Sequence, residues 1–234
     1  MATTPRSVPD ALPAPRRGRP PAGATPTSED VAEARARQII DAAYILLEEA
    51  GLEGLTIRAV LTRTGLSRRA FYERFAGKDD LVLAVFEHTI RLAAEQYERQ
   101  TSHLPDPQER LRLIVLSIAL ARGSLEDMNA RTENHPRGAA LSREHLRLAE
   151  SRPDELQGAL SPLLSLIARI VADGIAIGQF RQARPERLAT LIYNLVATTV
   201  HAQLLAEEAS HPDTERREEL AADIWEFCRR AIAA

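Results

Sequence analysis

The sequence predicts an all-α protein, and three observations support this fold class. Good helix formers, chiefly alanine, leucine, arginine and glutamate, dominate the 234 residues, whereas aromatic residues make up only 4%. Apolar residues recur at helical spacing along most of the chain, and no stretch shows the alternating pattern of a strand. A chain of this length can also bury a substantial core. We therefore expect a small helical domain followed by a larger one.

The first 27 residues differ in composition from the rest of the chain. They contain seven prolines, together with Gly18 and Gly23, and too few apolar side chains to form a core. The segment contains four arginines and one aspartate, so its net charge is positive. We expect residues 1–27 to be a disordered, basic, proline-rich arm.

Residues 28–80 predict three helices of a small domain. Helical spacing of apolar residues begins after Ser28 and stops at Gly51, which can cap a helix in the left-handed conformation. Thr56 is a good cap for a second, short helix that ends at Thr64. Gly65 then provides a tight turn, and Ser67 can cap a third helix. This order predicts a helix-turn-helix.

The remaining residues, 81–234, predict a larger helical body. A long helix should begin near Lys78 and end near Arg99, with Asp79 and Asp80 at its positive end. Another helix should begin at the cap Asp106, where Glu109 would complete a capping box, and it should end near Gly123. Four prolines mark the starts of further helices. Those prolines are Pro136, Pro153, Pro185 and Pro212.

Two segments of this body are apolar around most of their circumference, Leu160–Ile177 and Leu188–Leu205. Such helices either form a dimer interface or are ordinary core. Pro162 should kink or break the first of them.

Composition narrows the class of function. The net charge of the whole chain is -3, but residues 56–78 are basic and contain five arginines and one lysine against one glutamate. Such a local patch fits contact with a polyanion. Cys228 is the single cysteine, and His103, His135 and His145 show no metal-binding spacing, so we expect no metal and no cofactor. No signal peptide and no apolar run of about 18 residues is apparent, which predicts a cytoplasmic protein without membrane contact.

The stretch "TGLSRRAFYERF" separates an apolar face from a basic one. If Ser67 caps this helix, Phe71 and Phe75 lie one turn apart and belong to the core. Arg68 and Tyr72 then point outward, where arginine can bind a guanine or a phosphate in the DNA major groove. The alternative is a solvated face on which neighbouring charges pair with one another.

The longer stretch "LTIRAVLTRTGLSRRAFYERFAGKDDLVLAVF" resembles the DNA-binding domain of the TetR family of transcriptional regulators. The resemblance covers roughly residues 38–86. The matching positions are Gly51, Thr56, Gly65, Leu66, Ser67, Arg68, Tyr72, Phe75, Lys78, Asp79 and Asp80. It implies an N-terminal three-helix DNA-binding domain, followed by a larger helical domain for ligand binding and dimerisation.

The resemblance also implies roles for individual residues. Thr56, Tyr72 and Lys78 would contact phosphates of the double-stranded operator. Base edges or the adjacent backbone would be met by Ser67, Arg68, Arg69 and Ala70. The nearby Arg58 and Arg74 complete the candidate set of DNA-binding residues. Because Arg69, Ala70 and Arg74 depart from common family residues, no base preference can be predicted.

The family's properties further imply a homodimer that binds a palindromic operator, with half-sites about 34 to 36 Å apart or a multiple of that distance. A small-molecule effector would then release a repressor from DNA. An activator and an effector-independent architectural protein are alternatives. An all-α enzyme is a less favoured alternative, because the sequence contains no "GxSxG", Walker or "HExxH" motif.

Two further sets of residues are candidates for binding. Polar residues on apolar helices could line an effector pocket, namely Arg169, Asp173, Asn194 and His201. In the arm, "RRGRP" resembles an AT-hook core, which would place Arg16, Arg17 and Arg19 in the minor groove. The alternative for the arm is a solvated extension.

Overall fold

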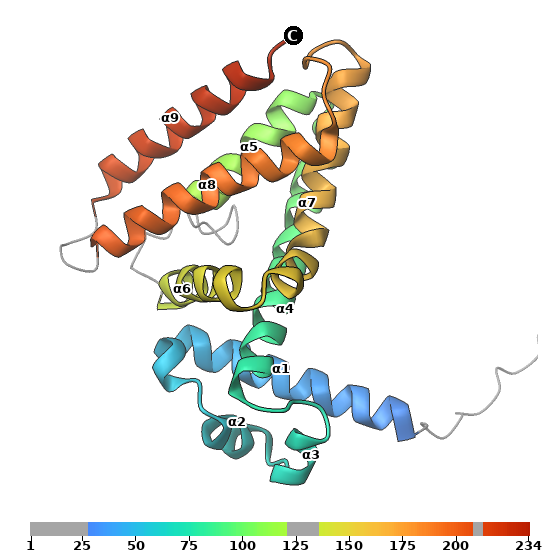
Figure 1. Cartoon of the computed structure of the whole chain (residues 1–234), viewed down its shortest axis with the longest axis vertical. Coiled ribbons are helices and arrows are strands. Elements are labelled where there is room, and N and C mark those ends of the chain that lie inside the picture. Colours follow the sequence, from blue (N-terminus) through green and yellow to red (C-terminus); the bar gives the residue numbers. More distant parts are fainter. Residues whose placement is uncertain (1–27, 121–135, 208–212) are drawn as a thin grey trace, which may run out of the picture.

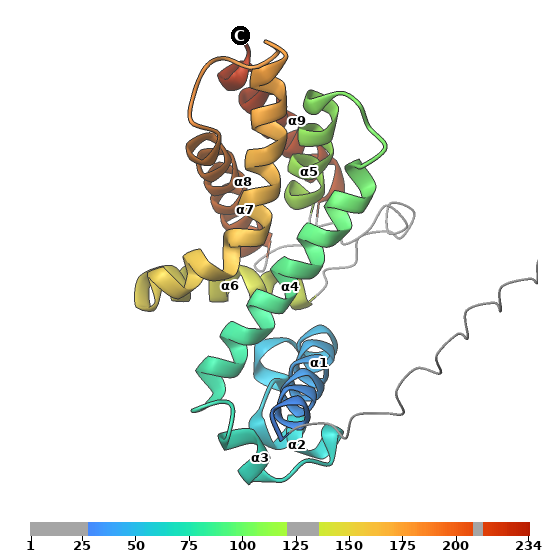
Figure 2. The same cartoon turned by 90° about the vertical axis from the view of Figure 1, so that its right-hand side faces the viewer.

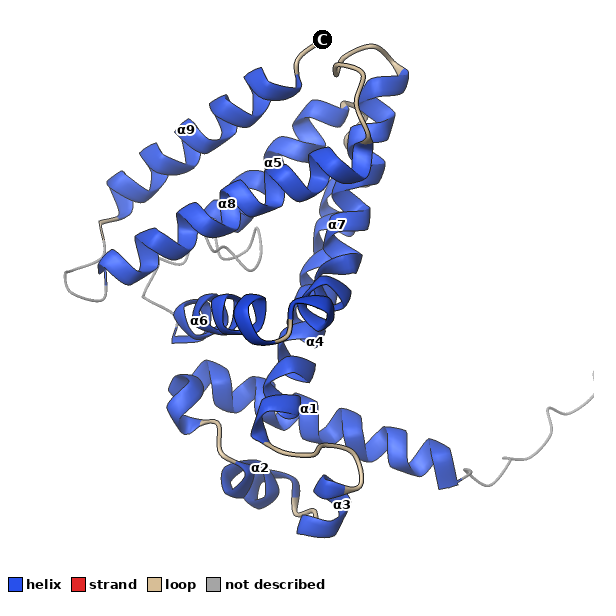
Figure 3. Ribbon diagram, in the orientation of Figure 1, coloured by secondary structure: helices blue, strands red, loops and turns tan. Residues whose placement is uncertain are grey.

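A computed structural model describes residues 28–120, 136–207 and 213–234, which form helices and no named strand (Figures 1 and 3). The all-α prediction is confirmed. The basic arm, Gly123 and Pro212 lie outside the described residues. The helices are α1 (Ser28–Gly54), α2 (Ile57–Thr64), α3 (Arg68–Tyr72), α4 (Lys78–Thr101), α5 (Pro107–Ala119), α6 (Pro136–Ser151), α7 (Pro153–Ala176), α8 (Pro185–Glu207) and α9 (Thr214–Ile232).

The helices form a small head at one end of the molecule and a larger body above it (Figures 1 and 2). Helices α1 to α3 and the beginning of α4 enclose one hydrophobic cluster, which contains Ile39, Leu55 and Phe71. A second cluster is built from the rest of α4 and helices α5 to α9. Helix α4 therefore contributes to both clusters and connects the head to the body.

The predicted capping residues precede α2, α3 and α5. The hydroxyl of Thr56 accepts a hydrogen bond from Ala59 N at 3.1 Å, and Ser67 does the same for Ala70 N at 3.2 Å. Asp106 caps α5 by accepting from Gln108 N at 3.0 Å. The reciprocal half of the predicted capping box is absent, since the carboxylate of Glu109 pairs with Arg112 instead.

Two glycines adopt the left-handed conformations that their turns require. Gly51 has a φ of 62° and interrupts α1 near its end, although one more helical turn follows it to Gly54. Gly65 has a φ of 68° and ends α2, and its N–H donates to Leu61 O at 2.9 Å. A residue with a Cβ pays about 1 to 2 kcal/mol in this region, which explains glycine at the turn of the helix-turn-helix.

Of the two outcomes predicted for Pro162, a kink or a break of the helix, the break is wrong. Helix α7 continues through Pro162 from Pro153 to Ala176, because its apolar face is held on both sides of the proline by the body core. Leu160 and Leu163 are buried on either side of it. Within the described residues, α7 has the length and hydropathy to span a membrane, but 56% of its apolar window is buried inside the chain.

The end of α7 is closed by a tight turn. Gly178 has a φ of 74°, and the chain returns so that the ring of Phe180 packs directly on Gly174. Phe180 is fully buried and forms an isolated antiparallel bridge with Ala233, which follows α9. This contact ties the top of α7 to the C-terminal end of the described chain.

Candidate DNA-binding surface

Helix α3 is fixed to the head by its two phenylalanines. Phe71 and Phe75 are both buried, and their ring centroids are 5.4 Å apart. They pack in the same cluster as Ile39 of α1 and Val60 of α2. The amide of Gln38 adds a polar contact between α1 and the end of α2 by donating to Thr64 O at 3.1 Å. The inward face of α3 is therefore the one predicted from the sequence.

The opposite face of α3 is open to solvent. Ser67, Arg68 and Arg69 are exposed, and Ala70 is half-buried. The Tyr72 side chain stands edge-on to the Phe71 ring, yet 53% of the residue's surface is accessible. A large aromatic side chain held outward beside two arginines has little to gain from the protein's own core. The arrangement is suited to a ligand that is negatively charged and extended.

The structure contains one ion pair of the kind expected if the outer face of α3 were only a solvated surface. The guanidinium of Arg69 donates to Glu73 at 3.0 Å, one helical turn away. The Arg69 side chain is 90% exposed, and such pairs contribute only a few tenths of a kcal/mol. The pair can therefore be exchanged for a phosphate contact at small cost.

The other candidate residues lie around α3. Thr56, Arg58 and Arg74 are exposed at the cap of α2, in its first turn and just after α3. Lys78 opens α4, and its ammonium donates to Leu52 O at 3.0 Å, which ties α4 to the end of α1. A lysine has three donors, so this bond leaves two for a phosphate.

Arg63 also belongs to the basic stretch, but its side chain is paired with α1 within the head. Its guanidinium makes a two-pronged pair with Glu49 of α1 at 2.9 and 3.0 Å. This contact raises the pKa of Arg63 and lowers the pKa of Glu49, mainly through the hydrogen bond between them. Arg63 is thus better assigned to holding α2 against α1.

Two salt bridges join the body to the beginning of α4. Arg147 of α6 pairs with Asp79 at 3.4 Å, and Arg152, just before α7, pairs with Asp80 at 3.0 Å. The pKa of Asp80 is lowered first by the hydrogen bond from Ala76 N–H and then by Arg152. A shift of α6 or α7 would therefore act directly on the residues next to Lys78.

The structure separates the four candidate effector residues. Arg169 and Asp173 of α7 are exposed and paired, Arg169 with Glu98 at 2.6 Å and Asp173 with Arg110 at 2.8 Å. Asn194 lies on an exposed stripe of α8. Only His201 is inside the body, with 6% of its surface accessible. These four residues do not share one site.

A polar cluster inside the body escaped the sequence analysis except for His201. We define it as Tyr97 of α4, His145 of α6, and Tyr193 and His201 of α8. The Tyr193 hydroxyl lies 3.4 Å from His145 Nδ1. Neither ring nitrogen of His201 has a hydrogen-bond partner, although both are buried. An isolated tyrosine or histidine on an apolar helix carries no sequence signal that separates it from ordinary core.

Burial shifts the titration of every member of the polar cluster. It raises the pKa of Tyr97 to about 12, and it raises the pKa of Tyr193, with a further contribution from Tyr97. Burial lowers the pKa of His145, and the neighbouring His201 lowers it further. The pKa of His201 is lowered by burial and by Arg143. At neutral pH the cluster is uncharged.

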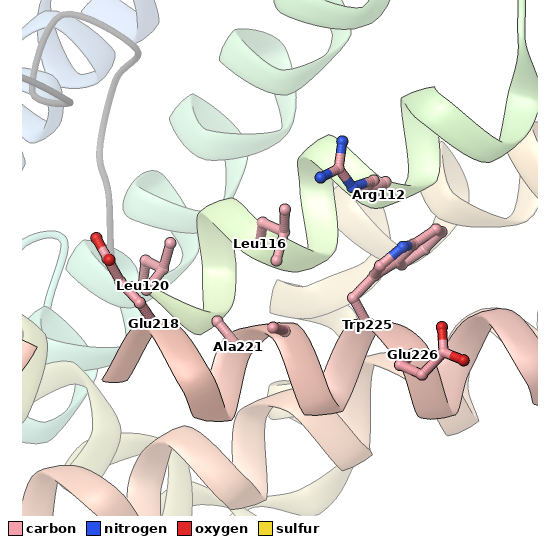
Figure 4. A pocket seen from close by; sticks show the side chains of 8 residues that line it. Arg112, Leu116, Leu120, Glu218, Ala221, Trp225 and Glu226 are labelled. Carbon is pink, nitrogen blue, oxygen red and sulfur yellow. The ribbon is translucent and has the colours of Figure 1, made fainter. Parts of the chain in front are cut away.

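A depression lies on the outside of the body, between α5 and α9 (Figure 4). It encloses about 430 Å³ and is open on one side. Leu116 of α5, Leu120 just after that helix and Trp225 of α9 form its apolar wall, with Arg112 and Glu226 at the rim. The carboxylate of Glu226 is already paired with Arg229 and Arg230. Within the described residues, no group of three potential metal ligands gathers at either location.

A buried helical core, an outward basic helix after a tight glycine turn, and a separate helical body define a helix-turn-helix protein. Residues 39–85 match the family model described as "Bacterial regulatory proteins, tetR family". The chain is also 38% identical over 84 residues to the HTH-type transcriptional regulator BetI of Burkholderia ambifaria. That alignment covers 36% of this chain and 43% of the relative, so less than half of the relative is matched.

Solved structures resemble the chain over most of its length. A TetR-family transcriptional regulator from Pectobacterium atrosepticum has a TM-score of 0.66 and 20% identity, covering 89% of this chain and 98% of that one. The transcriptional regulator FadR from Bacillus subtilis in complex with stearoyl-CoA has a TM-score of 0.57 and 18% identity, covering 82% and 96%. The fold of both head and body is therefore that of these regulators. The head therefore matches the TetR family by sequence, and the whole chain is similar in fold to TetR-family transcriptional regulators.

Proposed function

We propose that this protein is a repressor that binds a palindromic operator as a homodimer and leaves it when a small molecule binds the body. Base edges would be met by Ser67, Arg68, Arg69 and Ala70. Phosphates would be bound by Thr56, Tyr72 and Lys78, with Arg58 and Arg74 adding positive charge. We further propose domain limits of 28–80 for the DNA-binding domain and 81–234 for the effector and dimerisation domain, and a cytoplasmic location.

The observation that carries this proposal is the outward face of α3. Arg68 and Tyr72 are exposed on a helix whose other face is fixed by buried phenylalanines. Such a helix keeps its geometry when it enters the major groove, so little ordering entropy opposes binding. Arginine can donate two hydrogen bonds to a guanine, which gives base selectivity rather than charge attraction alone.

The homodimer proposal now rests on α8 and α9. The apolar segment Leu160–Ile177 was expected to form this interface together with Leu188–Leu205, but its leucines and isoleucines are mostly buried within the body core. Helix α8 leaves Leu191 56% exposed, and α9 leaves Phe227 64% exposed. Helices α8 and α9 contact one another, and two copies of the pair would form a four-helix interface.

Effector release requires only that the ligand prefer a conformation that binds DNA poorly. The salt bridges of Arg147 and Arg152 to Asp79 and Asp80 offer a direct connection between the body and the beginning of α4. The similar FadR of Bacillus subtilis was solved with stearoyl-CoA, so a body of this fold can hold a ligand with an apolar chain.

Other functions find less support. An activator would use the same DNA contacts and differ only in promoter position. An architectural protein would bind DNA with an affinity that no small molecule changes. For an enzyme, Cys228 is a poor nucleophile because burial raises the pKa of its thiol to about 11. The matched family and the structural neighbours are regulators rather than enzymes.

The N-terminal arm adds a second proposed contact. Arg16, Arg17 and Arg19 would enter the minor groove next to the operator and increase affinity for A·T-rich flanks. Deletion of residues 1–27 should then weaken binding to such flanks and leave the melting temperature unchanged. A marked fall in melting temperature would instead assign the arm a structural role.

A fluorescence-anisotropy titration tests the proposed function. The protein is titrated with DNA flanking its own gene and with a shuffled control, each at two salt concentrations. We expect the native DNA to bind about a thousandfold or more tightly, with an affinity that falls steeply as salt rises. Equal and weak binding to both, and to sequences selected from random DNA, would refute it.

A further inference from the structure

One member of the polar cluster inside the body, His201, lacks a hydrogen-bond partner. His201 is buried on α8, and both of its ring nitrogens lack a hydrogen-bond partner. Leaving such a group unpaired costs about 1 to 3 kcal/mol. Buried polar groups in proteins are nearly always satisfied, so the exception calls for an explanation. A bound ligand would supply the missing partner.

The neighbours of His201 are also suited to binding a polar group. The imidazole of His145 and the hydroxyl of Tyr193 are in contact, and the His145 ring packs between the rings of Phe86 and Tyr193 at 6.1 and 5.9 Å. Tyr97 acts electrostatically on Tyr193. Hydroxyl and imidazole groups from three helices therefore gather in one part of the core.

The charges around the two histidines favour an anion. Arg143 of α6 acts on His201 as a positive neighbour. His201 carries no charge at neutral pH, and it acts on His145 in the same way only when it is protonated. Glu144, the buried carboxylate next to His145, is neutralised by Arg147, whose Nε donates to it at 2.8 Å. Tyr97 and Tyr193 are neutral at physiological pH. A positive potential in an apolar surrounding attracts a negative group strongly.

We propose that the polar cluster binds the carboxylate of an organic acid with an apolar body. The imidazoles of His145 and His201 and the tyrosine hydroxyls would donate to the carboxylate oxygens. Buried neighbours such as Phe86, Leu148 and Val196 would surround the apolar part. This inference rests on the proposed function, since the acid would be the effector that releases the operator.

Proton uptake distinguishes this ligand from a neutral one. A carboxylate raises the pKa of a neighbouring imidazole, so the acid binds more tightly as the pH falls from 8 toward the imidazole pKa of the free protein, by up to about tenfold per unit for one proton. A neutral phenol or alcohol would instead donate its hydroxyl hydrogen to an unprotonated imidazole nitrogen. Its affinity would fall on acidification, because protonation removes that acceptor.

The test is calorimetric titration of the full-length protein with decanoate and 1-naphthoate, each compared with its uncharged amide. We expect at least one acid to bind about tenfold or more tightly than its amide. Repetition in buffers of different ionisation enthalpy should show proton uptake at pH 7.5. Absence of binding by both acids, equal binding of acid and amide, or binding without proton uptake would overturn the proposal.

Variants locate the site. His201→Gln should weaken binding of the acid by about ten- to a hundredfold and reduce proton uptake, and His145→Gln should act in the same direction. His103→Gln, at an exposed histidine after α4, is the matched control and should change neither quantity. Full affinity in both cluster variants, with an unchanged circular dichroism spectrum, would exclude this site.

The same samples separate this inference from the proposed function. A protein that binds its operator but neither acid refutes the inference alone. Tight binding of an acid that leaves operator affinity unchanged supports the site and refutes effector release by that acid.

Discussion

Replacement of His201 by leucine should stabilise the protein. The two buried ring nitrogens have no partner, and leucine has a similar volume without polar atoms. Removal of an unsatisfied buried group should raise the free energy of unfolding by about 1 to 3 kcal/mol. For a chain of this size each kcal/mol corresponds to about 2 to 4 °C in melting temperature.

The pH dependence of unfolding provides a second measure of the same residue. Burial lowers the pKa of His201 from its ordinary value of 6.5, so the unfolded chain takes up the proton first as the pH falls. Stability of the wild type is therefore fully present above pH 6.5 and decreases below it, toward the lowered pKa of the folded state. The leucine variant should lose less stability over that window.

Thermal unfolding followed by circular dichroism at pH 7.5 and pH 5.5 checks both quantities. The variant should melt at least about 2 °C higher at pH 7.5, with a wider difference at pH 5.5. A lower melting temperature at pH 7.5 would refute the reasoning, because it would mean that the imidazole makes stabilising contacts in the free protein.

Three further predictions concern DNA contact, coupling and packing. Arg68→Ala should weaken specific operator binding by about 1 to 3 kcal/mol, whereas Lys78→Ala should weaken binding to all sequences similarly and reduce the salt slope by about one; unchanged affinity in both would reject this DNA surface. Arg152→Ala should lower the effect of the effector on operator affinity by about fivefold or more while ligand-free binding persists, and an undiminished effect would exclude this salt bridge from the coupling. On α7, Gly174→Ala should lower the free energy of unfolding by several kcal/mol, because the new Cβ would overlap the buried Phe180 ring. Gly158→Ala, at a position with open space, should raise it by about 1 kcal/mol. Urea unfolding measures both variants, and equal effects would contradict the described packing.

The head was largely predictable because its signals are local. Caps such as Thr56 and Ser67 act within three residues, and the left-handed turn at Gly65 depends on one residue type. The spacing of Phe71 and Phe75 then fixed which face of α3 is buried. Each of these signals can be read without knowledge of tertiary contacts.

The body was less predictable because its site depends on tertiary contacts. Arg169 and Asp173 lie on an apolar helix in sequence, but partners from α4 and α5 hold them at the surface. Pro162 was expected to kink or break a helix that packing keeps continuous. His145 and Tyr193 come together across 48 residues, a separation over which a single sequence gives no indication of contact.

Footprinting of the operator complex tests the central claim most directly. Hydroxyl-radical protection, combined with interference by methylation of guanine N7, reports both the backbone contacts and the groove that α3 enters. The account predicts two protected half-sites about 34 to 36 Å apart or a multiple of that, with interference in the major groove that disappears in Arg68→Ala. Protection without paired half-sites, or binding insensitive to N7 methylation, would contradict it.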